Sequence, residues 1–371
     1  MPALGVLIKP VSGSCNMRCR YCFYQDIMTK RETACRGAMS EDTLEQLVRQ
    51  AFAYADTGCT FMFQGGEPTL RGLPFYERLI ELVTACNIRR LPVNYAFQTN
   101  GYAINEAWAA FFAKHRFLVG LSVDGTKDIH NYFRPDQRNN GTFSAVLRAA
   151  ACLDRAGVSY NILTVVTAQL ARHIEQVYGF YKKKRWFYQQ YIPCLDPLGE
   201  PRGQEPFSLT PPDYAVFLKK LFDLWYADLC ADRPVSIRYF DDLLLILKGY
   251  PPQSCGMIGQ CSCQNVIEAD GSVYPCDFYV LDDWKLGNIR EQSFAQLHAS
   301  PRAAAFIAAS RPLSEKCQQC PWLALCRNGC RRDRLGMLGE ENGENYYCAA
   351  FQEFLAYASC RLAGLASSIP S

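Results

Sequence analysis

The run Cys15-Asn16-Met17-Arg18-Cys19-Arg20-Tyr21-Cys22 follows an apolar stretch, residues 4–10, that has the composition of a β-strand. Its three cysteines are spaced C-x3-C-x2-C, and neither histidine nor a carboxylate lies between the first and the last. Three thiolates suit a four-iron cluster in which one iron keeps an open coordination position, whereas a structural zinc site uses four protein ligands. Cys35 could supply a fourth thiolate, so a zinc site is the alternative at this point.

The rest of the sequence is that of a globular protein rich in cysteine. It has 371 residues, of which 49% are hydrophobic and 20% charged, and its net charge of +3 is too small to predict nucleic-acid binding. Because the chain shows no signal peptide and no apolar run of the roughly 18 residues that a membrane helix needs, we expect a cytoplasmic protein that does not bind membranes. In such a chain, nineteen cysteines favour metal ligation over disulfides.

Up to about residue 240, short β-rich apolar runs alternate with amphipathic helical segments. This order predicts parallel strands joined by right-handed helical crossovers, and six strands indicate an α/β fold, a partial (β/α)6 barrel. A doubly wound sheet is the alternative, but neither G-x-G-x-x-G nor G-x-x-x-x-G-K-[ST] occurs. The strand candidates are residues 4–10, 59–64, 93–98, 117–123, 159–167 and 187–192. The helix candidates are residues 40–56, 74–87, 105–115, 142–156, 169–184, 213–232 and 239–249.

Nine cysteines lie between Cys255 and Cys348, in a region of short loops. Asp270-Gly271, between residues 265–269 and 272–275, predicts a β-hairpin. Loops so rich in cysteine bury little apolar area, so we expect bound metal to stabilise this region. Taken alone, the C-x2-C-x5-C-x3-C run at residues 317–330 would also suit one zinc ion.

The cysteine run at residues 15–22, followed by Gly65-Gly66-Glu67-Pro68 after the second strand, resembles the radical S-adenosylmethionine superfamily. The later cysteines are similar to the seven-cysteine pattern of the SPASM extension, with Cys255 as an eighth. The resemblance implies a partial (β/α)6 barrel of radical SAM type over residues 1–235. Over residues 236–371 it implies a linker helix, a small Cys-rich SPASM domain with a β-hairpin and helices, and a C-terminal helix. The implied cofactors are S-adenosyl-L-methionine and three 4Fe-4S clusters, one open-coordinate and two auxiliary.

Over nearly its whole length the chain resembles the anaerobic sulfatase-maturating enzymes, as in GSVYPCDFYVL at residues 271–281. These enzymes oxidise a cysteine or serine of a sulfatase to Cα-formylglycine. The resemblance implies hydrogen abstraction from Cβ by a 5′-deoxyadenosyl radical, proton removal by Asp277 and electron transfer to the auxiliary clusters. The implied partners are a sulfatase bearing Cys/Ser-x-Pro-x-Arg and an electron donor such as flavodoxin or ferredoxin.

The same resemblance implies a role for individual residues. The metal ligands would be Cys15, Cys19 and Cys22 for the open cluster, Cys255, Cys261, Cys276 and Cys330 for one auxiliary cluster, and Cys317, Cys320, Cys326 and Cys348 for the other. Cys263 is expected to be a bystander. The cofactor-binding residues would be Tyr21, Gln64, Gly65, Gly66, Glu67, Ser122, Arg134 and Leu195. Tyr24 would contact the substrate, and Asp277 would be catalytic.

Two other functions stay open. A ribosomal-peptide maturase that forms thioether or carbon–carbon crosslinks would use the same two-part layout. The other alternative is an iron–sulfur electron carrier or a zinc-stabilised binding module, neither of which would cleave S-adenosylmethionine. The glycine loop at residues 65–68 and the open-iron spacing of the first three cysteines argue against this alternative.

Overall fold

The computed structural model describes residues 3–334 and 343–368. They form two compact units. The first combines the chain up to Ser122 with Arg134–Tyr160 and Ser262–Phe306, and the second combines Val123–Phe133, Asn161–Cys261 and the chain from Ile307 onward. Each unit takes segments from both sides of residue 235, so this division does not test the domain boundary predicted there.

The first unit is built on a sheet in the order β10-β9-β8-β1-β2-β3-β4. Strands β1 to β4 and β8 are parallel, and β8, β9 and β10 are joined in antiparallel fashion. The hairpin predicted around Asp270-Gly271 is present, with Gly271 at φ 84°. The strands are β1 Leu4–Ile8, β2 Cys59–Phe63, β3 Val93–Thr99, β4 Leu118–Ser122, β8 Val266–Ile267, β9 Ser272–Tyr274 and β10 Gly287–Asn288.

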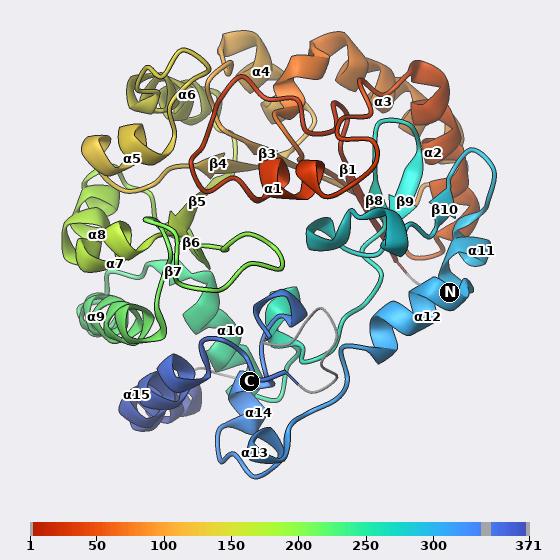
Figure 1. Cartoon of the computed structure of the whole chain (residues 1–371). Coiled ribbons are helices and arrows are strands. Elements are labelled where there is room, and N and C mark those ends of the chain that lie inside the picture. Colours follow the sequence, from red (N-terminus) through yellow and green to blue (C-terminus); the bar gives the residue numbers. More distant parts are fainter. Residues whose placement is uncertain (1–2, 335–342, 369–371) are drawn as a thin grey trace. The chain divides into compact units, whose positions relative to one another are not determined.

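Long helices cover the outer side of these strands (Figure 1). They are α2 Glu41–Tyr54, α3 Leu73–Cys86, α4 Glu106–Lys114 and α6 Phe143–Ala156. Ser40 caps α2 by accepting a hydrogen bond from the Thr43 amide at 3.1 Å. Beneath the helices, Phe97 of β3 is fully buried among aromatic rings, those of Phe63, Tyr76, Trp108, Phe112 and Phe117. The strands are rich in aromatic and other apolar residues, which is why the sequence revealed them.

Shorter elements of the first unit carry the loops described below. They are α1 Phe23–Thr29, η1 Pro68–Arg71, η3 Asp277–Tyr279, η4 Asp282–Trp284 and α11 Phe294–His298. The helix α12, Pro301–Ala308, follows.

The second unit contains the parallel strands β5 Tyr160–Val166, β6 Tyr188–Pro193 and β7 Ser236–Ile237. Its longest helices, α9 Pro211–Cys230 and α15 Cys348–Ser368, pack side by side (Figure 1), and Phe354 of α15 contacts the ring of Phe222. The other helices are α5 Lys127–Phe133, α7 Ala168–Arg172, α8 Ile174–Lys183, α10 Arg238–Leu247, α13 Glu315–Gln318 and α14 Leu323–Cys326. Short 3-10 turns, η2 Cys255–Met257 and η5 Arg331–Asp333, carry further cysteine loops.

One expected helix is wrong in detail. Residues 169–184 were predicted as a single helix, but His173 ends α7 and begins α8. The backbone of His173, at φ −110° and ψ 18°, leaves the helical conformation, and its Nδ1 lies 2.8 Å from the Gln169 carbonyl oxygen. The α/β class and its parallel strands are confirmed. In the part of the chain that the structure describes, no helix has both the length and the apolar character of a membrane span.

Candidate active site

The cysteine loop and the glycine loop of the first unit are joined backbone to backbone. The amide of Gly66 donates to the Ser12 carbonyl oxygen at 2.9 Å, and the amide of Glu67 donates to that of Ser14 at 2.8 Å. A Cβ at position 66 would lie 1.9 Å from the Ser14 oxygen. Position 66 therefore requires glycine for steric reasons. The two backbone hydrogen bonds hold the cysteine loop and the glycine loop together at the carboxyl ends of β1 and β2.

The three cysteines of the first loop lie within electrostatic reach of one another. Burial, assisted by the charges of nearby Glu67, Cys19 and Cys22, raises the pKa of the Cys15 thiol to about 12. The Met17 amide donates to Cys15 Sγ at 3.4 Å, and Asn100 Nδ2 lies 3.7 Å from the same sulfur. A buried sulfur that receives such donors becomes a thiolate when it binds a cationic metal, so this loop fits an iron–sulfur cluster.

The other predicted cofactor contacts are placed in different ways. The buried Glu67 carboxylate accepts hydrogen bonds from Thr69, Thr99 and the Asn100 amide, so it holds the loop itself together. Burial raises the pKa of Glu67 although these donors lower it. Arg134 Nη1 donates to the Tyr21 hydroxyl at 2.9 Å, which brings two predicted contacts together. The half-buried Ser122 ends β4, and Leu195 belongs to the second unit.

Strand register determines which residues meet beside the glycine loop. Ile8 of β1 is paired with Phe63 of β2 and with Ile267 of β8, and all three strands are parallel. The residues that follow, Lys9, Gln64 and Glu268, therefore stand level with one another at the carboxyl ends of the strands.

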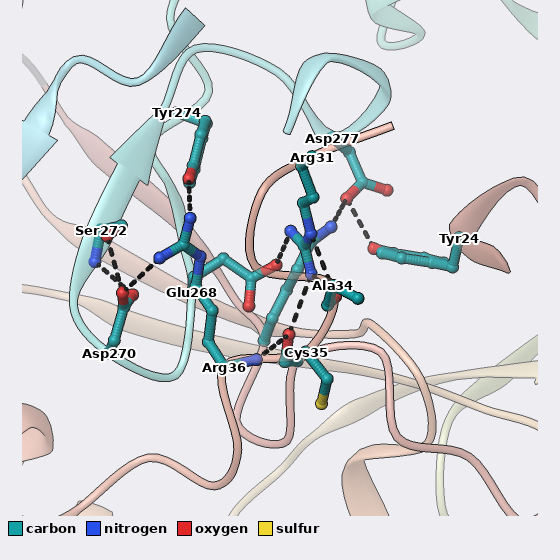
Figure 2. A network of polar contacts seen from close by, with 12 residues as sticks. Tyr24, Arg31, Ala34, Cys35, Arg36, Glu268, Asp270, Ser272, Tyr274 and Asp277 are labelled. Atoms are coloured by element: carbon teal, nitrogen blue, oxygen red, sulfur yellow. Dashed lines mark hydrogen bonds and ion pairs between the residues drawn. The ribbon is translucent and has the colours of Figure 1, made fainter. Parts of the chain in front are cut away.

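Asp277 reaches the same place from η3. The Phe278 ring packs edge-on against Phe23 of α1, at 5.1 Å between centroids, and so brings η3 against α1. Tyr24, the next residue of α1, donates its hydroxyl hydrogen to Asp277 Oδ1 at 2.5 Å (Figure 2).

Two more groups complete the surroundings of the Asp277 carboxylate. Lys9 Nζ lies 2.8 Å from Oδ1, and Gln64 Nε2 donates to Oδ2. Burial, and then the charge of Asp277, raise the pKa of Tyr24 well above its ordinary value, so Tyr24 stays protonated and remains a donor. The sequence predicted Tyr24, Gln64 and Asp277, and the structure brings them together. It did not predict Lys9, whose only sequence signal is a cation at the end of an apolar strand.

A second polar network adjoins this site (Figure 2). Arg31 Nη1 donates to Glu268 Oε1 at 2.8 Å, and both side chains are almost completely buried. Arg36 Nη1 donates to Asp270 Oδ2 at 2.8 Å, on the turn of the hairpin. The network fastens residues 31–36 to the hairpin of β8 and β9, and no residue of it was predicted as functional from the sequence.

The later cysteines of the second unit fall into two groups. Cys317, Cys320, Cys326 and Cys348 line one pocket, together with Lys316, Trp322, Leu323, Asn328, Asn345, Phe351 and Gln352. Burial raises the pKa of Cys326 to about 11, and Gln352 Nε2 lies 3.8 Å from Cys320 Sγ. The apolar walls and converging sulfurs fit an iron–sulfur cluster.

The second group is Cys255, Cys261 and Cys330. Burial and the nearby Asp333 raise the pKa of Cys330, and Cys255 and Cys261 raise it further. Cys276 belongs to the first unit, as does Cys263. Among the described residues, no three His, Cys, Asp or Glu side chains lie close enough together to bind a single metal ion. The assignment of Cys276 to one cluster with Cys255, Cys261 and Cys330 stays a prediction.

Family comparisons match two parts of the chain. Residues 10–180 match the radical SAM superfamily, and residues 255–321 match the SPASM family, an iron-sulfur cluster-binding domain. The glycine and cysteine loops lie within the first match and the hairpin within the second, so the chain is a radical S-adenosylmethionine enzyme with a SPASM region.

Full-length relatives narrow the class. A cysteine-type anaerobic sulfatase-maturating enzyme of Clostridium novyi (strain NT) is 48% identical over 369 residues, which cover 100% of this chain and 99% of the relative. This chain belongs to the family of cysteine-type anaerobic sulfatase-maturating enzymes. A serine-type relative from Bacteroides thetaiotaomicron is 28% identical over 373 residues, 96% of this chain and 89% of that protein. A solved structure of native anSMEcpe with bound AdoMet and Kp18Cys peptide has a TM-score of 0.95 and 47% identity, covering 99% of this chain and 100% of that chain.

Proposed function

We propose that this enzyme oxidises a cysteine side chain of a sulfatase to Cα-formylglycine, and that Asp277 removes the substrate proton. The observation that carries the proposal is the buried Asp277 carboxylate at the carboxyl ends of β1 and β2, beside the joined cysteine and glycine loops. The identity of 48% with a cysteine-type enzyme, against 28% with a serine-type one, supports cysteine as the substrate residue.

The cofactors would be held by residues already described. Cys15, Cys19 and Cys22 would ligate the open cluster, and S-adenosylmethionine bound there supplies the abstraction of a hydrogen atom from Cβ. Its polar groups would meet the Gly65-Gly66 backbone, Tyr21, Ser122 and Arg134, and Leu195 would contact the adenine. The auxiliary clusters would be held by Cys255, Cys261, Cys276 and Cys330, and by Cys317, Cys320, Cys326 and Cys348. They supply an acceptor for the second electron of the oxidation.

The protein's own contribution is to manage the substrate proton. We infer that Asp277 accepts the thiol proton, and the burial of its carboxylate away from bulk water supports this role. Tyr24 donates a hydrogen bond to this carboxylate, and its raised pKa keeps it from competing for the proton. Asp277 directly follows Cys276, so the proton acceptor and the proposed cluster ligand share one turn of backbone.

The partners and location follow from the same proposal. The substrate would be a sulfatase segment containing Cys-x-Pro-x-Arg, and an electron donor such as flavodoxin or ferredoxin would reduce the open cluster. We propose that the reaction takes place in the cytoplasm.

The experiment uses the anaerobically iron-loaded full chain with a sulfatase-derived cysteine peptide. We expect mass spectrometry to show that the peptide exchanges one sulfur and two hydrogens for one oxygen. A crosslinking maturase would instead remove two hydrogens and keep the sulfur, and an electron carrier would leave the peptide unchanged. Either result would overturn the proposed activity.

The role of Asp277 has its own test. Asp277→Asn should abolish formylglycine while deoxyadenosine formation continues, because the amide cannot accept the proton. The matched control is Asp283→Asn, at an exposed position six residues further along, which should behave like the wild type. A near-normal aldehyde yield from Asp277→Asn would remove Asp277 from the reaction.

A further inference from the structure

Lys9 is completely buried although it carries an ammonium group. Its Nζ lies 2.8 Å from Asp277 Oδ1 and 3.9 Å from the centroid of the Tyr24 ring. The approach to Asp277 is an ion pair, and within residues 3–334 and 343–368 Nζ makes no hydrogen bond. A buried cation is costly unless an opposite charge or an aromatic face compensates it, so Asp277 and Tyr24 provide the compensation that the structure shows.

Lys9 is not needed to neutralise the other buried carboxylate at this level. The pairing of Ile8 with Ile267 sets Lys9 level with Glu268. Glu268 nevertheless pairs with Arg31, at 2.8 Å between Nη1 and Oε1. Because Arg31 already neutralises Glu268, the ammonium group of Lys9 forms its ion pair with Asp277.

The two oxygens of Asp277 have different partners. Oδ1 faces the Lys9 ammonium and accepts the Tyr24 hydroxyl hydrogen, whereas Oδ2 accepts from the Gln64 amide. A carboxylate turns easily about its last side-chain bond, and a charged partner holds an oxygen more strongly than a neutral amide does. The arrangement therefore fixes Oδ1 and leaves Oδ2 as the oxygen whose partner is more readily exchanged.

We propose that Lys9 is a positioning residue: it holds Oδ1 of Asp277, so that Oδ2 faces the substrate thiol, which displaces the Gln64 amide. In the proton transfer, the S–H bond breaks, an O–H bond forms at Oδ2, and the sulfur keeps the electron pair. This inference rests on the proposed function, because it assigns the oxygen through which Asp277 acts.

The test measures formylglycine formed per deoxyadenosine in the iron-loaded full chain with the cysteine peptide. Lys9→Met keeps the length of the side chain and removes the charge, Lys9→Gln keeps a neutral donor, and Lys9→Arg keeps the charge. We expect both uncharged variants to lower the ratio of formylglycine to deoxyadenosine at least ten-fold. The KM for the peptide should change by less than about two-fold, because the peptide still binds and only the orientation of the Asp277 carboxylate is lost. Lys9→Arg should recover part of the ratio at unchanged iron content.

The outcomes separate this inference from the proposed function. An uncharged variant with full iron content and a wild-type ratio would overturn it. Loss of iron from both uncharged variants would also overturn it, since Lys9 would then have a purely structural role. If Asp277→Asn, measured in parallel, loses formylglycine while Lys9→Met keeps the wild-type ratio, only the role of Lys9 is wrong. If Asp277→Asn itself keeps that ratio, the proposed base is wrong.

Discussion

Removing one partner of the ion pair of Arg31 and Glu268 should be one of the most destabilising single changes in the first unit. The two side chains are 2% and 1% exposed, and Arg31 also donates to Ser12 Oγ at 3.1 Å. Among the described residues, Glu268 Oε2 accepts no hydrogen bond, so the Glu268 carboxylate depends on Arg31. Removing one partner of a buried pair leaves an uncompensated charge and costs about 3–5 kcal/mol. We expect Arg31→Met to lower the melting temperature of this 371-residue chain by about 5 °C.

A double-mutant cycle tests the mechanism. Urea and thermal unfolding are measured without oxygen on iron-loaded wild type, Arg31→Met, Glu268→Gln and the double variant. Because the double variant leaves no unpaired buried charge, it should be more stable than either single variant. Arg49→Met is the control, because its ion pair with Glu45 lies on the surface and Arg49 is 61% exposed, so no measurable change is expected.

Two results would refute the reasoning. If the double variant loses as much stability as the two single variants together, the charges act independently and the pair has no special role. If Arg31→Met is as stable as the wild type, its buried contacts do not hold residues 31–36 to the hairpin.

Three other changes address the cofactor sites. Gly66→Ala should abolish S-adenosylmethionine binding in equilibrium dialysis because of the backbone clash, whereas Gly179→Ala, whose Cβ would meet nothing within 4 Å, should bind normally; binding by Gly66→Ala would contradict the loop geometry. Cys326→Ala should lower the iron content from about twelve to about eight per chain, and an unchanged count by elemental analysis would remove Cys326 from the ligands. Gln352→Leu removes the donor 3.8 Å from Cys320 Sγ and should lower the reduction potential of that cluster in an EPR-monitored titration; an unchanged or higher potential would contradict this.

The sequence predicted the strands well because they are short runs rich in aromatic and other apolar residues, as in CTFMF of β2. It predicted one helix where His173 separates two, because the amphipathic pattern continues through a local break. It gave no expectation for α1, which is only seven residues long and begins directly after Cys22. Short elements of this kind are fixed by their packing against distant segments rather than by their own pattern.

The site was predictable where chemistry restricts residue type and spacing. Thiolate ligands must be cysteines at set intervals, and a backbone that approaches another backbone must be glycine. Lys9, Arg31 and Glu268 could not be found in this way. Their roles depend on partners far away in the sequence, Asp277 for Lys9 and Glu268 for Arg31, and such contacts have no local sequence signal.

The parallel pairing of β8 with β1 also limits how this enzyme can be divided. β8 lies inside the region matched to the iron-sulfur cluster-binding domain, yet it completes the edge of the amino-terminal sheet. A fragment that stopped before β8 would leave one side of β1 unpaired, and a bare apolar edge of this kind invites association between chains. Transplanting the carboxyl-terminal region from another enzyme would carry a matching condition: the incoming strand has to meet Leu7 and Ile8 in the native register. The regions matched to the radical SAM superfamily and to the SPASM family therefore cannot be exchanged independently between enzymes.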